Sequence, residues 1–291
     1  MNDILKISSI LSEDEALEVQ NYLINKYSEK TMVYGPDVIL DDPGLINVIK
    51  KFKQSIELKY KRKIYLSREL QLQINRRDNT GKNVGWHIDG SQEIINSKLL
   101  DPYVCRQDYQ LYKVGIYFQK NDRNSPGGID VKPVVKIPMK YFPKILHYPL
   151  LLLNTSLSMK LFKGVTIENQ PGDAILFNSK IPHRATPKLD VNTPESHKIV
   201  LYFNASFIAE YVDLHHEFMF KMAIFGDDND RAHYKRALSS KLDTKFKGIS
   251  RELPCFFNDI IIEKTRKLFN PRLTIIPDDY LIRSAPENIK Y

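Results

Sequence analysis

Four short segments of alternating hydrophobicity in the middle of the chain constrain its fold most. They are LQLQINR (residues 70–76), YKVGIYFQ (112–119), AILFNS (174–179) and HKIVLYFNASF (197–207), each bounded by Gly, Pro, Asn or Asp. A period of two residues is typical of β-strands, and turn residues between such strands favour an antiparallel sandwich or barrel. The last segment is apolar on both faces at its centre, so we expect it to be an interior strand.

Helical patterns flank these strands. Ser12, followed by three acidic residues, predicts an N-cap and a helix that continues over residues 16–27. Pro43 predicts the start of a second helix, because apolar residues recur on one face from there to Ile56. After Phe207 the pattern predicts helices over 210–226, 230–242 and 258–268, followed by an irregular tail. The expected fold class is therefore mainly β with flanking helices.

We expect one domain over residues 1–291, because no repeat, low-complexity tract or Pro/Gly/Ser-rich linker divides the chain. Residues 1–69 should pack on the barrel as helices, residues 70–207 should form its core, and residues 208–291 should form a helical extension. This extension either lines a substrate entrance or caps the barrel, and the sequence leaves both alternatives open.

Composition limits the setting and the partners. The start lacks a basic segment followed by an apolar one, and no apolar run is long enough to cross a bilayer, so we expect neither a secretion signal nor a membrane span. Only Cys105 and Cys255 could pair, which favours a reducing cytoplasm over a disulfide framework. The net charge of +8 suits an anionic partner, but the lysines are spread along the chain, so nucleic acid is not the favoured one. Nothing indicates an oligomeric state.

A candidate metal site combines two separate segments. In GWHIDG, His87 and Asp89 stand two residues apart, which places both side chains on the same face of a strand. In PGDAILFNSKIPHRATP, a turn and a buried strand lead to His183, the best third ligand. The other histidines fall in a loop, at a strand start or in the helical tail: His147, His197, His215, His216 and His233. Two histidines and one carboxylate are the ligand set of non-haem ferrous iron. Taken separately, the first pair could be a surface turn and His183 a core histidine.

The order of these pieces resembles the phytanoyl-CoA dioxygenase family of iron- and 2-oxoglutarate-dependent oxygenases. The resemblance covers roughly residues 70–207: a strand, GWHIDG, a strand ending in Gln119, the turn NDRNSPGGIDVKP, PGDAILF and then a histidine. It implies a double-stranded β-helix, a jelly-roll of the cupin type, that uses Fe(II), 2-oxoglutarate and O2. Asp89 implies hydroxylation, since similar halogenases have a small residue in its place.

The resemblance also implies side chains for 2-oxoglutarate. The family normally has an arginine 10 to 15 residues after the distal histidine, whereas this chain has Lys198 fifteen residues after His183. A lysine supplies a point charge in place of a bidentate fork. Arg184 competes for this role, but an adjacent residue on a strand should point away from the metal. For the near carboxylate and keto group the polar candidates are Gln73, Asn75, Tyr117 and Asn204.

The resemblance therefore implies a dioxygenase that hydroxylates a small organic substrate. Positive charge, including Arg76, Arg77 and the region of Lys140, Lys144 and Lys160, favours an anionic one: a sugar, an acyl conjugate, an amino acid or a natural product. Two alternatives stay open. The same metal ligands and the basic charge would suit an oxidative demethylase of alkylated nucleic acid. The change from arginine to Lys198 would suit a metal-binding barrel without oxygenase activity.

Overall fold

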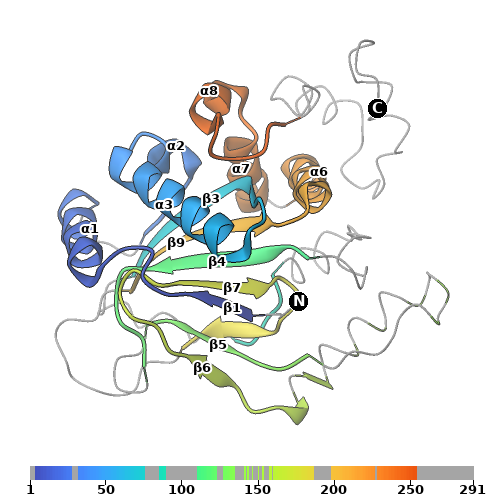
Figure 1. Cartoon of the computed structure of the whole chain (residues 1–291). Coiled ribbons are helices and arrows are strands. Elements are labelled where there is room, and N and C mark those ends of the chain that lie inside the picture. Colours follow the sequence, from blue (N-terminus) through green and yellow to red (C-terminus); the bar gives the residue numbers. More distant parts are fainter. Residues whose placement is uncertain are drawn as a thin grey trace.

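The computed structural model describes most of the chain as two β-sheets with helices around them (Figure 1). The described residues are 4–27, 32–75, 85–89, 110–122, 127–134, 161–186, 198–226 and 228–253, with isolated residues between 141 and 160. The predicted helix over 258–268, the tail and both cysteines lie outside these ranges. Among the described helices, none is long and apolar enough to cross a membrane.

The larger sheet has six strands in the order β1-β7-β4-β9-β3-β2, and every neighbouring pair is antiparallel. In chain order these strands are β1 (Ile4–Ile7), β2 (Met32–Tyr34), β3 (Tyr65–Asn75), β4 (Tyr112–Tyr117), β7 (Ala174–Asn178) and β9 (Lys198–Ser206). The strand predicted to be interior is β9, which indeed lies between β4 and β3. Burial on both sides explains why its centre is apolar on both faces.

The smaller sheet has the order β6-β5-β8, with β5 (Ile129–Val131), β6 (Val165–Ile167) and β8 (His183–Ala185). An isolated bridge between His87 and His183 adds the His87 segment beyond β8. From β3 onward the chain alternates between the larger and the smaller sheet: the His87 segment, β4, the pair β5 and β6 within the smaller sheet, and then β7, β8 and β9. This path is that of a double-stranded β-helix, which confirms the predicted fold class.

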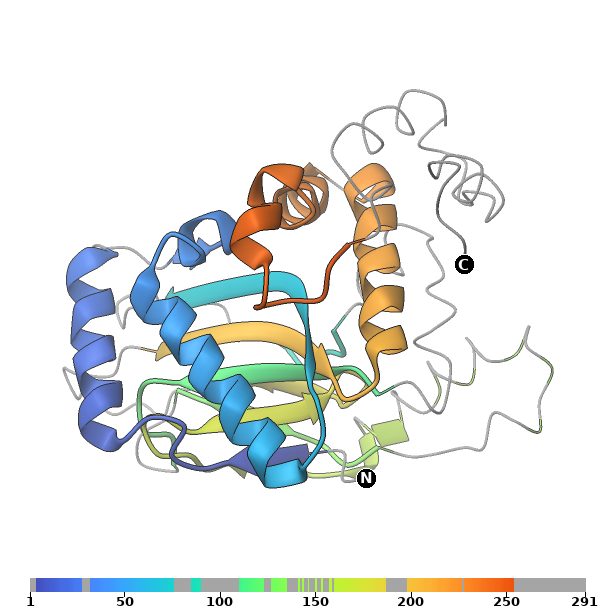
Figure 2. The ribbon, with the colours of Figure 1, turned by 45° about the horizontal axis from the view of Figure 1, so that its top comes forward.

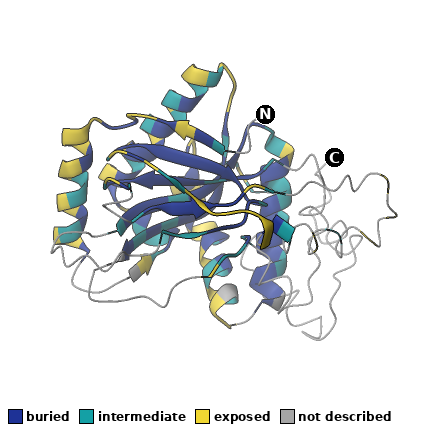
Figure 3. Ribbon diagram, turned by 90° about the horizontal axis from the view of Figure 1, so that it is seen from below, coloured by how far each residue is buried: buried dark blue, intermediate teal, exposed yellow. Residues whose placement is uncertain are grey.

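Helices cover one face of the larger sheet. Figure 2 shows α3 (Pro43–Tyr60) crossing its strands, α1 (Glu13–Lys26) beside it, and α6 (Ala209–Phe225) at one end of the strands. Phe52 of α3 packs edge-on against Phe203 of β9, with ring centroids 5.1 Å apart. This face carries the apolar alternate residues of β3, whereas Gln71 and Gln73 face the barrel interior. Figure 3 shows the same division, with buried strands and helices exposed on their outer sides.

The predicted helix starts are confirmed by their caps. Ser12 and Glu15 form a capping box at the start of α1, and Asp42 accepts hydrogen bonds from two backbone amides at the start of α3. The prediction was wrong for residues 230–242, where α7 (Asp228–Ala237) ends early and a 3₁₀ turn (Ser240–Leu242) and α8 (Asp243–Phe246) follow. The short helix α2 (Pro36–Ile39) was not predicted, and β3 begins at Tyr65, five residues before the predicted start.

Candidate metal centre

The backbone brings the two candidate histidines face to face. The His87 amide donates to the His183 carbonyl at 3.0 Å, and the His183 amide donates to the His87 carbonyl at 2.8 Å. His183 opens β8, whose pairing with β5 fixes it in the smaller sheet. Between His87 and Asp89, the side chain of Ile88 is buried, and strand alternation returns Asp89 to the histidine side. His87 and Asp89 thus lie on the same face of the segment, as their two-residue spacing predicted.

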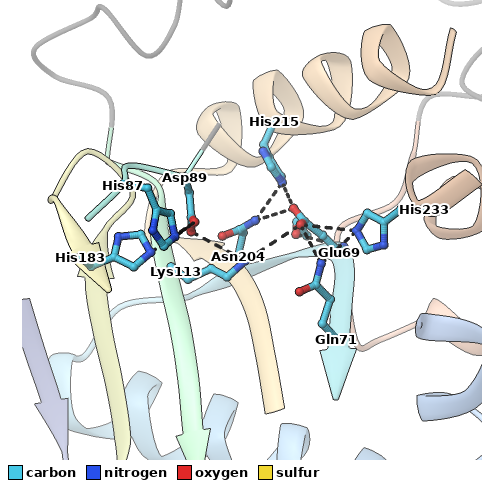
Figure 4. Close-up of polar contacts among 10 residues, drawn as sticks. Glu69, Gln71, His87, Asp89, Lys113, His183, Asn204, His215 and His233 are labelled. Carbon is cyan, nitrogen blue, oxygen red and sulfur yellow. Dashed lines mark hydrogen bonds and ion pairs between the residues drawn. The ribbon is translucent and has the colours of Figure 1, made fainter. Parts of the chain in front are cut away.

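The three side chains converge (Figure 4), and one ligand atom from each lies within 4.8 Å of the other two. Asp89 Oδ1 is 3.3 Å from His183 Nε2 and 3.9 Å from His87 Nε2. The two imidazole rings have their centroids 4.4 Å apart. The predicted metal ligands are therefore neighbours in the structure, on one side of the smaller sheet.

Backbone carbonyls orient both imidazoles. His87 Nδ1 lies 2.9 Å from the Gly85 carbonyl oxygen, and His183 Nδ1 lies 2.9 Å from the Ile181 carbonyl oxygen. A carbonyl can only accept, so each Nδ1 carries the proton and donates it. In a neutral imidazole this arrangement leaves Nε2 with a lone pair, which is the tautomer that a metal-binding histidine needs.

The charges of the cluster also suit a metal. Burial raises the pKa of Asp89, but Lys113, followed by the two histidines, lowers it by more. The pKa of Asp89 therefore lies well below its usual range. Burial, helped by His183, lowers the pKa of His87, which keeps its imidazole neutral at neutral pH. An ionised carboxylate and a neutral imidazole are the forms that bind metal ions. Asp89 Oδ2 is buried without a hydrogen-bond partner among the described residues. The residues present therefore fit Fe(II).

A cavity of about 210 Å³ opens beside the three residues. Lys198 at the start of β9, Gln73 of β3 and Tyr202 of β9 line it, together with Lys113. The predicted cosubstrate residues Lys198 and Gln73 thus lie at the same cavity as the metal cluster. Asn75 pairs with Lys198 in the β3–β9 register, but its side chain is outside the described part of the structure.

The remaining candidates are placed differently. Arg184 borders the cavity, but its Nε lies 3.1 Å from Asp130 Oδ2 and its guanidinium stacks over the Trp86 ring at 4.6 Å. Tyr117 is fully buried and is not among the residues that line the cavity. Burial, with Tyr202 as a second cause, raises the pKa of Tyr117 well above its ordinary value. Lys198 therefore differs from both: it lines the cavity, whereas Tyr117 does not, and it forms no ion pair with a described carboxylate, whereas Arg184 does.

A second polar cluster lies across the barrel from the metal ligands and was not predicted (Figure 4). Its centre is Glu69 of β3, whose Oε2 accepts from Asn204 Nδ2 at 2.7 Å and from His215 Nε2 at 2.9 Å. His233 of α7 lies 3.6 Å from Oε1, and Gln71 donates to the same oxygen at 3.4 Å. The available sequence signal was an acidic residue in the inward-facing register of a strand, two positions before Gln71.

Lys113 connects the two clusters. It extends inward from β4, and its Nζ lies 3.8 Å from Asp89 Oδ2 and 4.0 Å from Glu69 Oε1. None of the described residues that line the cavity comes from α6 or α7. These helices instead contact the second cluster, where His215 of α6 and His233 of α7 lie next to Glu69.

Comparisons with known proteins were made at three levels. No family model matches the chain, and no curated protein matches it. The resemblance to the phytanoyl-CoA dioxygenase family therefore stays a prediction. Similar solved structures include the non-heme alpha-ketoglutarate-dependent epimerase SnoN from nogalamycin biosynthesis, at 10% identity and a TM-score of 0.44, covering 73% of this chain and 84% of that one.

Two further structures are similar at the same level. HygX from Streptomyces hygroscopicus, solved with nickel and 2-oxoglutarate, has 17% identity and a TM-score of 0.45 over 70% of this chain and 82% of its own. The non-heme alpha-ketoglutarate-dependent carbocyclase SnoK from nogalamycin biosynthesis has 11% identity and a TM-score of 0.44 over 70% and 79%. These values are too low to assign a role to any residue of this chain.

Proposed function

We propose that this protein is an Fe(II)- and 2-oxoglutarate-dependent dioxygenase that hydroxylates a small organic substrate. The observation that carries the proposal is the convergence of His87, Asp89 and His183 at a cavity that Lys198 also lines. The net charge of +8 supports an anionic substrate, such as a sugar acid, an acyl conjugate, an amino acid or a natural product.

In this proposal His87, Asp89 and His183 would hold Fe(II). The backbone carbonyls of Gly85 and Ile181 fix the orientations of the two imidazole rings, so that metal binding would need little reorganisation. With 2-oxoglutarate and O2, the bound iron supplies the oxidising chemistry that yields succinate, CO2 and a hydroxylated product. The protein contributes placement of the reactants and neutralisation of charge.

Lys198 is the lysine we assign to the far carboxylate of 2-oxoglutarate. Among the described residues, three cationic side chains other than histidine line the cavity, and two of them face carboxylates. Arg184 pairs with Asp130, and Lys113 lies between Asp89 and Glu69. Among the described residues, no carboxylate forms an ion pair with Lys198, whose Nζ lies 5.9 Å from the Tyr202 ring centroid. Gln73 is the cavity amide we assign to the near carboxylate and keto group.

The proposal is tested by adding Fe(II) and 2-oxoglutarate to the protein without oxygen. An absorption band that needs both additions is expected, and succinate should form once O2 is admitted with a substrate panel. Lys198→Met should raise the 2-oxoglutarate concentration for half-maximal band intensity by roughly 10- to 100-fold, the cost of a charged hydrogen bond. Lys198→Arg should recover most of that loss.

The matched control is Lys51→Met, because Lys51 forms a surface ion pair with Glu15 and should leave the band unchanged. Absence of the iron-dependent band, together with no succinate from any substrate, would sink the proposal. Metal binding without 2-oxoglutarate binding would identify a barrel that keeps the metal alone. Binding of single-stranded DNA that weakens steeply with salt would favour the nucleic-acid alternative.

A further inference from the structure

Lys113 lies between two carboxylates that differ in how they are held. Its Nζ is 3.8 Å from Asp89 Oδ2 and 4.0 Å from Glu69 Oε1, so the two distances are nearly equal. The side chain is only 14% exposed, and strand β4 fixes its base opposite Asn204 and Phe177. Only the flexible end of the lysine can move, and it can favour either carboxylate.

Glu69 is a fixed anion. Its Oε2 is anchored by Asn204 from β9 and His215 from α6, which leaves Oε1 facing Lys113. Burial raises the pKa of Glu69, but the charge of Lys113 and the hydrogen bonds of His215 and His233 hold this pKa well below its ordinary value. The carboxylate is therefore ionised and cannot turn away from its partners.

Asp89 is held less firmly. Its Oδ1 faces the two histidines, and its Oδ2 makes no hydrogen bond with any described residue. The ammonium of Lys113 is the countercharge that this oxygen meets. A divalent ion bound by Asp89 would take over the carboxylate charge and repel the ammonium, because like charges at a few ångströms interact strongly inside a protein.

We propose that Lys113 is a positioning residue that Asp89 and Glu69 share: it pairs with Asp89 in the metal-free protein and is held by Glu69 once the metal is bound. The inference rests on the proposed metal site. Without metal, Lys113 prevents Asp89 from being a partly buried carboxylate with no countercharge. With metal, Glu69 receives the lysine, so that the lysine does not compete for the ligand. His215 gains a role too, because it anchors Glu69.

The test is Zn(II) affinity, measured by competition with a chromophoric chelator, in the wild type and three variants. Glu69→Gln should weaken Zn(II) binding by about tenfold, because the charge of Glu69 then no longer draws Lys113 away from Asp89. Lys113→Met should bind Zn(II) at least as tightly as the wild type. The double variant should match Lys113→Met, since without the lysine the charge of Glu69 no longer matters for the metal.

Matched controls are Glu15→Gln and Lys51→Met, which remove the same two charges from a surface pair and should leave Zn(II) affinity unchanged. The inference would be overturned if Glu69→Gln weakened Zn(II) binding equally in the presence of Lys113 and in the Lys113→Met background. It would also be overturned if Lys113→Met alone weakened Zn(II) binding. Thermal unfolding of each variant, followed by circular dichroism, checks its fold.

Crystal structures of the wild type provide a test that needs no variant. Zn(II) should bring Lys113 Nζ closer to Glu69 Oε1 and farther from Asp89 Oδ2, and an unmoved lysine would overturn the inference. The proposed metal site has its own distinguishable failure. A wild type that does not bind Zn(II), or binds it as tightly after Asp89→Asn, would overturn that site itself.

Discussion

Two clusters inside one barrel use the same residue types for different purposes. At one side, Asp89 meets His87 and His183, and at the other, Glu69 meets His215 and Asn204. In the first cluster both Nδ1 atoms are bound to backbone carbonyls and one carboxylate oxygen has no hydrogen bond among the described residues. In the second cluster, two donors bind the same carboxylate oxygen directly.

This difference separates a ligand set from a structural network. A buried carboxylate that is hydrogen-bonded by its neighbours, as Glu69 is, is stabilised without a metal. A carboxylate with an oxygen that has no hydrogen bond, beside two imidazoles, is the arrangement that we propose as the metal site. The presence of histidine and carboxylate side chains therefore does not define a metal site, and the state of their hydrogen bonds does.

The largest expected effect is loss of metal binding when a ligand of the first cluster is removed. Asp89→Ala should lower Zn(II) affinity by more than about a hundredfold, beyond the range of roughly 10- to 100-fold that changes around a ligand produce. Zn(II) titration against a chelator measures the loss. His215→Gln, in the second cluster, should cost far less. Equal losses would show that the two clusters do not differ in the way proposed here.

Stability should respond in the opposite order. Glu69→Ala leaves Lys113, His215 and Asn204 without their shared acceptor, and removing one partner of a buried pair costs about 3–5 kcal/mol of unfolding free energy. Asp89→Ala should cost less than about 1 kcal/mol in the metal-free protein, because Asp89 is 30% exposed and Lys113 keeps Glu69. Urea unfolding of both variants without metal measures the two costs. A larger loss for Asp89→Ala would reverse the comparison.

The first cluster could be predicted from the sequence because its signals are local. His87 and Asp89 are two residues apart on one segment, and strand alternation is sufficient to place them together. To place His183 next to them, the position of β8 had to be known. The only sequence signal for that position was that His183 follows a turn and a buried strand. Likewise, the alternation predicted for residues 112–119 is seen in β4, where Val114 packs in one hydrophobic cluster and Tyr117 in another.

The second cluster could not be predicted because its residues are far apart in the chain. Glu69 and His215 are separated by 146 positions, and the contact depends on how α6 leaves β9 and turns over the end of the sheet. Short strands such as β1 and β2 were missed for a related reason. Their three or four residues become strands because an edge of the larger sheet pairs with them, which no local pattern reveals.

The smallest expected effect is on the pH dependence of stability. Because the pKa of Glu69 is lower in the folded protein than its ordinary value, the unfolded chain binds more protons between these two values. Its contribution to stability is therefore complete above about pH 4.5 and is lost as the pH falls towards the folded pKa. Glu69→Gln lacks this contribution at every pH.

The stability difference between the wild type and Glu69→Gln should accordingly narrow below about pH 4.5, by at most about 1.4 kcal/mol per pH unit for one proton. Urea unfolding of both proteins between neutral pH and pH 3, without metal, measures this difference. Because burial alone would raise the pKa of a carboxyl group, a difference that instead widens with acid would mean that Lys113 and the histidines do not outweigh burial. Glu69 would then be a neutral acid and could not hold the lysine, so the second cluster would lose the charge on which its contrast with the metal ligands depends.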